Sequence, residues 1–242
     1  MLAAQRRQAI RRLLADRPTM RIVELAAELH VSRDTVRRDL RFLADGPARA
    51  AGGHRPGRDP YAPAKIKVAS AAARLVRPGQ TIALTAGTTT RALARAVAQI
   101  PGVVIVTNSL PVVRLLDSLA PGVELVLTGG ERGIVGALLG PIALGAVRSL
   151  NVDWLFMGAN GVDGPGGVTA FDLGEAELHR EWIHHAENVA ILADHSKWGA
   201  RARSTVLPLS EVGVLVTDED MPPEAKRVAQ RSVRKLILAP AA

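Results

Sequence analysis

The chain of 242 residues contains no cysteine, and it has only 3 Trp, 1 Tyr and 3 Phe. Without cysteine it can form neither disulfides nor thiolate metal sites, and it cannot use a thiolate nucleophile. So few aromatic side chains offer little surface on which the bases of a single-stranded nucleic acid could stack. No apolar run approaches the roughly 20 residues of a membrane-spanning helix, and the amino-terminal segment is charged throughout. The sequence therefore predicts a cytoplasmic protein with neither an export signal nor a membrane partner.

Positive charge is concentrated at one end of the chain. Residues 1–60 contain 13 Lys and Arg against 7 Asp and Glu, whereas residues 61–242 contain 18 against 16, so that +6 and +2 give the net charge of +8. A basic segment of this kind is expected of a part that meets a polyanion, although an arginine-rich solvated surface is the alternative. The chain is long enough for this segment to be a small domain in front of a larger one.

The basic segment has the pattern of three short helices. Apolar residues recur at helical spacing in RRQAIRRLLADR, which Pro18 ends, and again in MRIVELAAELH. After a turn, Ser32 can cap a third helix by accepting hydrogen bonds from backbone N–H groups, and Val36, Leu40 and Leu43 continue its apolar stripe. Three short helices with a tight second turn predict a helix-turn-helix.

The outer face of the third helix would make the DNA contacts. If Val36 and Leu40 face the core, the polar residues around them point outward, where a recognition helix meets base edges and phosphates in the major groove. An arginine can contact guanine through two hydrogen bonds or bind a phosphate, and the sequence does not distinguish these roles. A solvated helix with an Asp34–Arg38 pair is the alternative, but it would not explain the surplus of arginine. The predicted DNA-binding residues are Ser32, Arg33, Thr35, Arg37 and Arg38.

The stretch RIVELAAELHVSRDTVRRDL, residues 21–40, resembles the helix-turn-helix signature of the DeoR family of bacterial transcriptional regulators, especially in its VS..T.RRDL ending. In that family a β-wing runs from a Gly-Leu pair to an Arg-x-His-Gly-Gly stretch. Here the corresponding segment reads LADGPARAAGGHRP, in which Pro47 and the alanines are poor strand formers. The chain thus departs from the family pattern in the wing.

A segment without apolar periodicity separates the two parts. GPARAAGGHRPGRDPYAP, residues 46–63, is rich in Gly, Pro and Arg, and is interpreted as a wing remnant followed by a linker. Beyond it, short aliphatic runs alternate with helix-length segments, a pattern typical of parallel strands buried on both faces. We therefore predict an α/β chain: a small winged helix-turn-helix domain at 1–56, a linker at 57–63, and a doubly wound, mostly parallel α/β domain at 64–242. The predicted strands are TIALT, VVIVT, VELVLT, DWLFMG, NVAILAD, VGVLVTD and KLILA.

Small and polar residues follow these predicted strands. In an open parallel sheet ligands bind outside the carboxyl ends of the strands, so the residues after each strand would share one edge. Gly87 and the three threonines behind it open a helix whose free N–H groups and dipole favour an anion. Each motif alone is more often a cap or a turn, and their shared position supports a joint site. The predicted effector-binding residues are Gly87, Thr88, Thr89, Thr90, Asn108, Gly130, Arg132, Asn160, Asp163, Glu175 and Lys197.

These groups suit a small, hydroxylated and phosphorylated ligand. The threonine turn would hold the phosphate, and Arg132 or Lys197 would neutralise it. Asn108, Asp163 and Glu175 would hydrogen-bond the sugar hydroxyls. Solvated surface is the alternative for Lys197, and a solvated helical face for Glu175.

Neither a metal nor a cofactor is predicted. His179, His184 and His185 fall on one predicted helix, but they do not share a face at a spacing that would hold a metal, and no cysteine could complete such a site.

The motifs GTTT, VTNS, GGER, DWLFMGANGVD, GEAELHREWI and ADHSKWG are similar, in this order, to those of the DeoR family's C-terminal sensor domain. The resemblance implies a domain similar to ribose-5-phosphate isomerase that senses phosphorylated sugar intermediates. The family often has Asp in its LD.GTT motif, whereas Thr85 and Ala86 replace the Asp-x pair here. The effector could differ accordingly.

We therefore predict a sequence-specific transcriptional regulator, a repressor of a sugar-metabolism operon whose DNA binding is modulated by a phosphorylated sugar. Its partners would be double-stranded operator DNA and the phosphosugar, and a homodimer or homotetramer would read repeated half-sites. One alternative is a phosphosugar isomerase-like enzyme, in which Asp163 or Glu175 with Lys197 would move protons. An isomerase has no use for a basic helix-turn-helix, and fold similarity alone does not carry activity, so no catalytic residue is predicted. A nonspecific architectural DNA protein is a weaker alternative.

Overall fold

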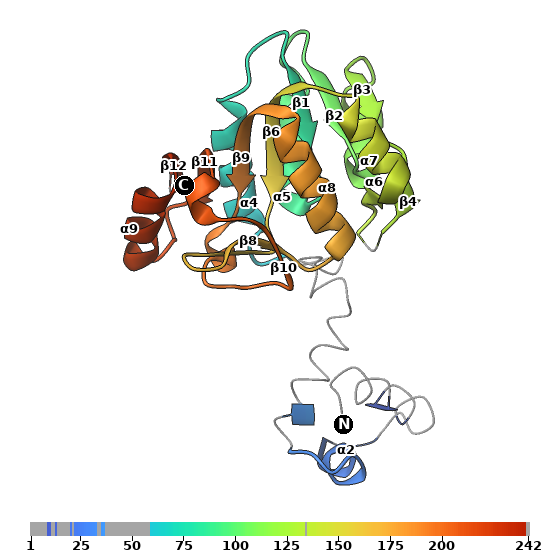
Figure 1. Ribbon diagram of the computed structural model, residues 1–242, viewed down its shortest axis with the longest axis vertical. Helices are drawn as coiled ribbons and strands as arrows, with labels where there is room; N and C mark the ends of the chain where they lie inside the picture. Colours follow the sequence, from blue (N-terminus) through green and yellow to red (C-terminus); the bar gives the residue numbers. More distant parts are fainter. Residues whose placement is uncertain are drawn as a thin grey trace. The chain divides into compact units, whose positions relative to one another are not determined.

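The structure is a computed structural model that describes residues 9–10, 13, 20, 22–32, 35–36, 59–133 and 135–240. The chain divides into two compact units, residues 1–57 and residues 58–242 (Figure 1). Each unit is taken by itself below. Among the residues described, no helix has both the length and the apolar character needed to cross a bilayer.

In the first unit, α2 (Ile22–Glu28) buries Leu25 and Ala26 in a small apolar cluster with Val36. The helix ends in a Schellman motif: His30 has a positive φ of 51°, and Val31 N donates to Ala26 O at 3.0 Å. This turn reverses the chain toward the predicted third helix. The first predicted helix is described only at three of its residues, and the wing segment lies outside the described residues.

The second unit is built on a seven-stranded sheet in the order β12-β11-β9-β6-β1-β2-β3, with every neighbouring pair parallel. All the aliphatic runs predicted as strands lie in this sheet, which confirms the predicted fold class. The strands are β1 (Thr81–Leu84), β2 (Val104–Thr107), β3 (Glu124–Leu127), β6 (Val152–Gly158), β9 (Ala186–Leu192), β11 (Val214–Asp218) and β12 (Lys235–Ala239).

Helices cover both faces of the sheet because alternate strand residues point to opposite sides. Ile82 and Phe156 pack on one side in a cluster with residues of α4, α5 and α6, whereas Ala83 and Leu155 pack on the other with residues of α7, α8 and α9. Figure 1 shows α8 in front of the sheet and α4 and α5 behind it. The helices are α4 (Ala62–Ala73), α5 (Thr88–Val97), α6 (Leu110–Leu119), α7 (Gly140–Arg148), α8 (Leu173–His184) and α9 (Pro223–Ser232).

Two small antiparallel sheets were not predicted from the sequence. One pairs β7 (Gly161–Asp163), β8 (Gly167–Ala170) and β10 (Ser204–Leu207), and the other pairs β4 (Glu131–Arg132) with β5 (Leu138–Leu139). Gly161 is required in the first sheet, because a Cβ there would lie 2.1 Å from the carbonyl oxygen of Ala200. Strands of two to four residues are too short to show the alternation by which strands are recognised in a sequence.

The order of the strands reverses at β1, which lies between β2 and β6. Helices that follow β1 and β6 leave opposite faces of the sheet, and a crevice is expected where they diverge. Because all seven strands are parallel, their carboxyl ends meet at one edge. The "carboxyl rim" denotes here the residues that follow β1, β2, β3, β6 and β9, namely 85–90, 108–109, 128–130, 159–160 and 193–197.

Candidate functional site

The start of α5 opens on the carboxyl rim beside the strand reversal. The first bond inside the helix runs from Arg91 N to Gly87 O at 3.1 Å, so the N–H groups of Thr88, Thr89 and Thr90 have no partner within the helix. Among the residues described, no side chain caps this end of the helix. The nearby Thr90 hydroxyl donates to Gly87 O at 3.1 Å. Uncapped N–H groups at the positive end of the helix dipole favour an anion.

Thr85, which occupies the place where the family often has Asp, is fully buried at the strand reversal. Its hydroxyl oxygen accepts a hydrogen bond from Gly158 N at 3.3 Å and so joins the ends of β1 and β6. The side chain is thus used to hold the two strands at the point where the crevice begins.

Asn108 connects three loops of the carboxyl rim. Its side-chain oxygen accepts from Ala86 N at 3.0 Å, and its Nδ2 donates to Leu138 O at 3.1 Å. The backbone carbonyl of Asn108 also accepts from Leu138 N at 2.7 Å. We expected this amide to bind a sugar hydroxyl, but the residue is only 1% exposed and its two side-chain groups bond the protein. The geometry favours a positioning role.

Glu175 lies on the first turn of α8, which Asp172 caps by accepting from Glu175 N at 3.0 Å. Burial raises the pKa of the Glu175 carboxyl to about 7, and the negative charge of Asp172 adds to the shift. One turn later His179 is also buried, its pKa is lowered to about 4, and its Nδ1 has no hydrogen-bond partner in the described chain. A carboxyl group with this pKa can donate to or accept from a ligand hydroxyl near neutral pH.

Asn160 and Gly130 shape the carboxyl rim by their contacts with the backbone of neighbouring segments. The Asn160 side chain accepts from Phe171 N at 3.1 Å and so fixes the segment that leads into α8. Gly130 has a φ of 119°, and a Cβ there would lie 2.5 Å from Leu139 O. Glycine is therefore needed for the close approach of the β4–β5 hairpin. Arg132 lies exposed on this hairpin, opposite Leu138 in the register.

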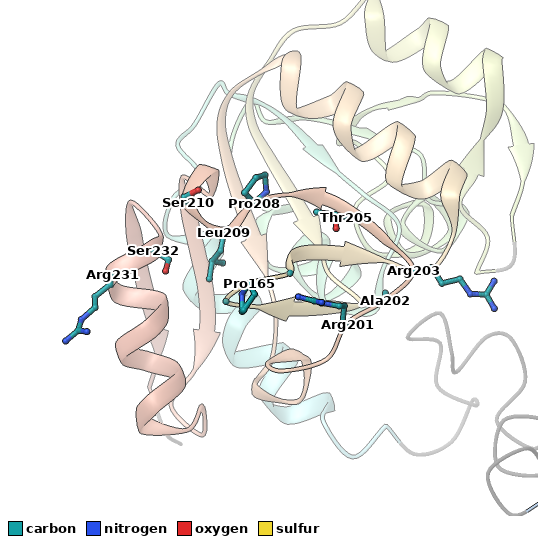
Figure 2. A pocket seen from close by; sticks show the side chains of 12 residues that line it. Pro165, Arg201, Ala202, Arg203, Thr205, Pro208, Leu209, Ser210, Arg231 and Ser232 are labelled. Carbon is teal, nitrogen blue, oxygen red and sulfur yellow. The ribbon is translucent and has the colours of Figure 1, made fainter. Parts of the chain in front are cut away.

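Asp163 lies at the far end of β7, opposite Gly167, rather than on the carboxyl rim. Its carboxylate accepts from Arg201 Nη2 at 3.1 Å. Arg201 also lines a cavity of about 610 Å³ beside the β7–β8–β10 sheet, together with Arg203 and Arg231. Figure 2 shows Arg203 and Arg231 extending away from the cavity at opposite sides. None of the predicted effector residues is among the described residues that line it.

Lys197 follows β9 in a short 3₁₀ turn, η1 (His195–Lys197), which Asp194 caps through Ser196 N at 3.1 Å. Burial lowers the pKa of the Lys197 ammonium, and the neighbouring Asp194 opposes this shift. His195 is held in the same turn because Asp218 accepts from His195 N at 2.8 Å and lies 2.6 Å from His195 Nδ1. The turn presents Lys197 at the carboxyl rim, as the sequence predicted for a residue after this strand.

A buried lysine at the start of α4 was missed in the sequence. Lys65 is only 3% exposed and forms an ion pair with Asp59, with 2.5 Å between Nζ and Oδ2. The signal was present, because Lys65 occurs three and four residues before Val68 and Ala69, on the face that α4 buries. The sequence predicts a linker at residues 57–63 and effector residues only after the strands, so Lys65 is not among the predicted site residues.

In the first unit, Ser32 and Thr35 are the two predicted DNA-binding residues that the structure describes. The Ser32 hydroxyl accepts from Thr35 N at 3.1 Å and lies 2.8 Å from the Thr35 hydroxyl, as expected of an N-cap. Arg33, Arg37 and Arg38 lie outside the described residues, so their contacts with DNA stay a prediction from the sequence.

The chain was compared with known families, proteins and structures. The model of the DeoR-like helix-turn-helix domain matches residues 6–55, and that of the DeoR C-terminal sensor domain matches residues 61–219. The HTH-type transcriptional repressor CsqR of Escherichia coli (strain K12) is 32% identical over 240 residues, which cover 93% of this chain and 92% of that protein. The glycerol-3-phosphate regulon repressor of the same strain is 29% identical over 242 residues, covering 94% and 96%.

Among solved structures, ribose 5-phosphate isomerase A from Methanocaldococcus jannaschii matches with a TM-score of 0.41 and 21% identity. The match covers 55% of this chain and 53% of that one.

Proposed function

The chain belongs to the DeoR family of transcriptional regulators, and from this premise we propose that it is a repressor whose operator affinity falls when a phosphorylated sugar binds the carboxyl rim. The family consists of regulators with a helix-turn-helix domain, so the chain is a DNA-binding regulator rather than an enzyme. Two relatives are named repressors, and one is named for the glycerol-3-phosphate regulon. These names support a repressor role and a phosphorylated effector.

The observation that carries the effector proposal is the uncapped start of α5 at the strand reversal. Three threonine N–H groups open there on the side of the sheet where its strands end. A phosphate monoester would accept hydrogen bonds from these N–H groups, with Lys197 as a counter charge. Glu175, near half protonation at neutral pH, would bind a hydroxyl of the sugar. Arg132 lies exposed on the β4–β5 hairpin, and Asp163 lies at the far end of β7. We therefore assign these two residues no more than a peripheral role in effector binding.

Regulation would arise from a coupling free energy between two sites. The effector and the operator would each favour a different arrangement of the subunits, so that either ligand weakens the binding of the other. Typical couplings of roughly 1–3 kcal/mol change an affinity by about 5- to 150-fold. We propose a homodimer or homotetramer, because one small helix-turn-helix makes too few contacts for tight and specific binding.

The proposal is tested by measuring operator affinity with the full-length chain. Fluorescence anisotropy with DNA from the promoter region beside its gene should show specific binding that weakens steeply with salt, because bound arginines release counterions from the phosphates. Addition of a panel of sugar phosphates should lower that affinity for at least one compound, whereas the matching unphosphorylated sugar should not. Equal affinity for random duplex, or indifference to every sugar phosphate, would contradict the corresponding half of the proposal.

A further inference from the structure

The cavity beside the β7–β8–β10 sheet is a different site from the carboxyl rim. Two of its walls are formed by η2 (Leu209–Glu211) and by the end of α9, which lead into β11 and β12. Arg234 N donates to Val212 O at 3.1 Å, so these two segments meet at the amino ends of the parallel strands. The carboxyl ends lie at the opposite edge of the sheet. The cavity volume of about 610 Å³ is that of a small-molecule site.

Backbone contacts fix the wall segment that carries Arg201. On one side of this residue, Gly199 N donates to Val162 O at 2.8 Å, which holds the segment against β7. On the other side, Ala202 N donates to Thr169 Oγ1 at 3.0 Å, which holds it against β8. A binding residue on a fixed backbone keeps its place before the ligand arrives.

The guanidinium of Arg201 is itself held by two contacts. Its Nη2 donates to the Asp163 carboxylate at 3.1 Å, and the group lies directly against Gly166, where a Cβ would lie 2.5 Å from Arg201 Nε. Figure 2 shows this side chain pointing toward Pro165. The side chain is 57% exposed, so the guanidinium is accessible to a ligand. An arginine that is already oriented loses little conformational freedom when it binds an anion.

The walls of the cavity carry positive charge. Among the described residues that line it, the charged ones are three arginines, Arg201, Arg203 and Arg231. The Asp163 carboxylate behind Arg201 offsets one of these three charges, which leaves 3 − 1 = +2. Next to the lining residues, the charges of Arg180 and Glu211 offset each other. A ligand with two negative charges would balance the site.

The positive charges are spread across the cavity rather than gathered at one point. Figure 2 shows Arg203 and Arg231 extending at opposite sides, and both are exposed, so they are free to turn toward a ligand. Leu209, only 3% exposed, and Pro208 give the wall between them an apolar surface. Separated charges with an apolar surface between them suit a ligand with an acidic group at each end and methylene groups in the middle. A phosphate monoester instead carries both charges on one group.

We propose that this cavity binds a short aliphatic dicarboxylate. Arg201 binds one carboxylate through the N–H groups that Asp163 leaves free, and Arg231 binds the other from the end of α9. Arg203 adds to the positive potential, and the methylene groups lie on Leu209. The protein thereby gains a second small-molecule site, which does not depend on the effector proposed for the carboxyl rim.

The inference is tested by isothermal titration of the full-length chain with malonate, succinate, glutarate and adipate at low salt. At least one of these dicarboxylates should bind saturably with one site per chain and a Kd below about 10 mM. Butyrate, a chain of the same length as succinate with a single carboxylate, should bind at least roughly tenfold more weakly than the best dicarboxylate. Added salt should weaken the binding, because the arginines are exposed.

Substitutions then locate the binding. Arg201→Gln and Arg231→Gln should each lower the affinity for the best dicarboxylate by roughly tenfold. Arg227→Gln, at an exposed position one turn earlier on α9 and outside the cavity lining, is the matched control and should leave the affinity unchanged. Lys197→Gln, at the carboxyl rim, should leave it unchanged as well. Thermal unfolding shows whether each variant is folded.

Gly166→Ala keeps every charge of the cavity and tests the placement of Arg201. The new Cβ would displace the guanidinium that lies against Gly166, so the affinity should fall by roughly fivefold. This variant tests the inference even if an arginine variant fails to fold.

The inference is overturned if none of the four dicarboxylates binds, or if butyrate binds as tightly as they do. It is also overturned if Lys197→Gln loses the binding whereas Arg201→Gln, Arg231→Gln and Gly166→Ala keep it, since the dicarboxylate would then occupy the carboxyl rim. None of these results changes the response of operator binding to sugar phosphates, so they leave the proposed function as it stands.

Discussion

Glu175 and His179 lie one turn apart on the buried face of α8, and burial moves their pKa values in opposite directions. The pKa of Glu175 rises from 4.5 to about 7, and that of His179 falls from 6.5 to about 4. Between these values the folded protein keeps the carboxyl largely protonated and the imidazole uncharged. Two titratable groups are thus buried without placing a charge inside the domain.

The two groups act oppositely on stability between pH 4.5 and 6.5. The folded pKa of Glu175 is raised, so the contribution of this group to the free energy of unfolding is fully present below pH 4.5. That contribution is lost as the pH rises toward 7. The folded pKa of His179 is lowered, so its contribution is present above pH 6.5 and is lost as the pH falls toward 4. The free energy of unfolding of Glu175→Gln, taken relative to that of the wild type, should therefore rise with pH. We expect a rise of up to about 1 kcal/mol per pH unit.

Urea denaturation at several pH values in this window measures the difference between variant and wild type. His179→Gln should give a difference of the opposite slope, and Glu177→Gln, an exposed position on the same helix, should give none. Parallel pH profiles for wild type and Glu175→Gln would refute the raised pKa.

Asn108→Ala should destabilise the domain by about 2–4 kcal/mol, because it leaves Ala86 N–H and Leu138 C=O without their hydrogen-bond partner in a buried place. Chemical denaturation gives the magnitude. Asn151→Ala, at an exposed position, is the control. A loss below about 0.5 kcal/mol would show that the three loops of the rim do not depend on this amide.

Gly130→Ala should destabilise the β4–β5 hairpin by about 1–3 kcal/mol, since its φ of 119° disfavours a side chain and the new Cβ would meet Leu139 O. Thermal unfolding and effector titration should both show the change. Gly122→Ala, where a Cβ would meet nothing within 4 Å, should be nearly neutral. Equal melting temperatures for the two variants would contradict the steric argument.

Arg37→Ala and Arg38→Ala should each weaken operator binding by roughly tenfold while leaving the melting temperature unchanged. A variant that loses a phosphate contact should also reduce the slope of log affinity against log salt by about 1. Anisotropy titrations at several salt concentrations separate the two kinds of contact. Arg231→Ala, exposed at the end of α9, should match wild type. Unchanged affinity in both helix variants would contradict the assigned recognition face.

The parallel sheet could be predicted from the sequence because its strands are short aliphatic runs, and the central ones, such as residues 104–107, are largely buried. The β7–β8–β10 sheet could not, because strands as short as Gly161–Asp163 owe their form to tertiary contacts such as the close approach of Ala200 O to Gly161. A local sequence pattern indicates which residues are buried. It does not indicate which distant backbone atoms pack against a glycine.

The part of the candidate site that directly follows the strands could be predicted from the sequence. The position of Lys197 and of the threonine turn at the carboxyl rim was predicted in this way, and their contact with an effector stays a prediction. Asn108 was placed correctly in the chain, but its amide bonds the backbone, which only the packed loops reveal. Lys65 was missed because it precedes the first strand, and only the tertiary structure brings the helix start to the same edge as the strand ends.

The central position of β1 has a consequence for how the chain is made. Its two neighbours are β2, which follows within 23 residues in the paired register, and β6, whose Trp154 pairs with Ile82 72 residues later. On the ribosome, β1 must therefore wait with one edge open until residue 158 has emerged, a long interval for a strand with a buried, aliphatic sequence. Nascent chains that stop between β3 and β6 would expose that edge, and we expect them to be prone to aggregate.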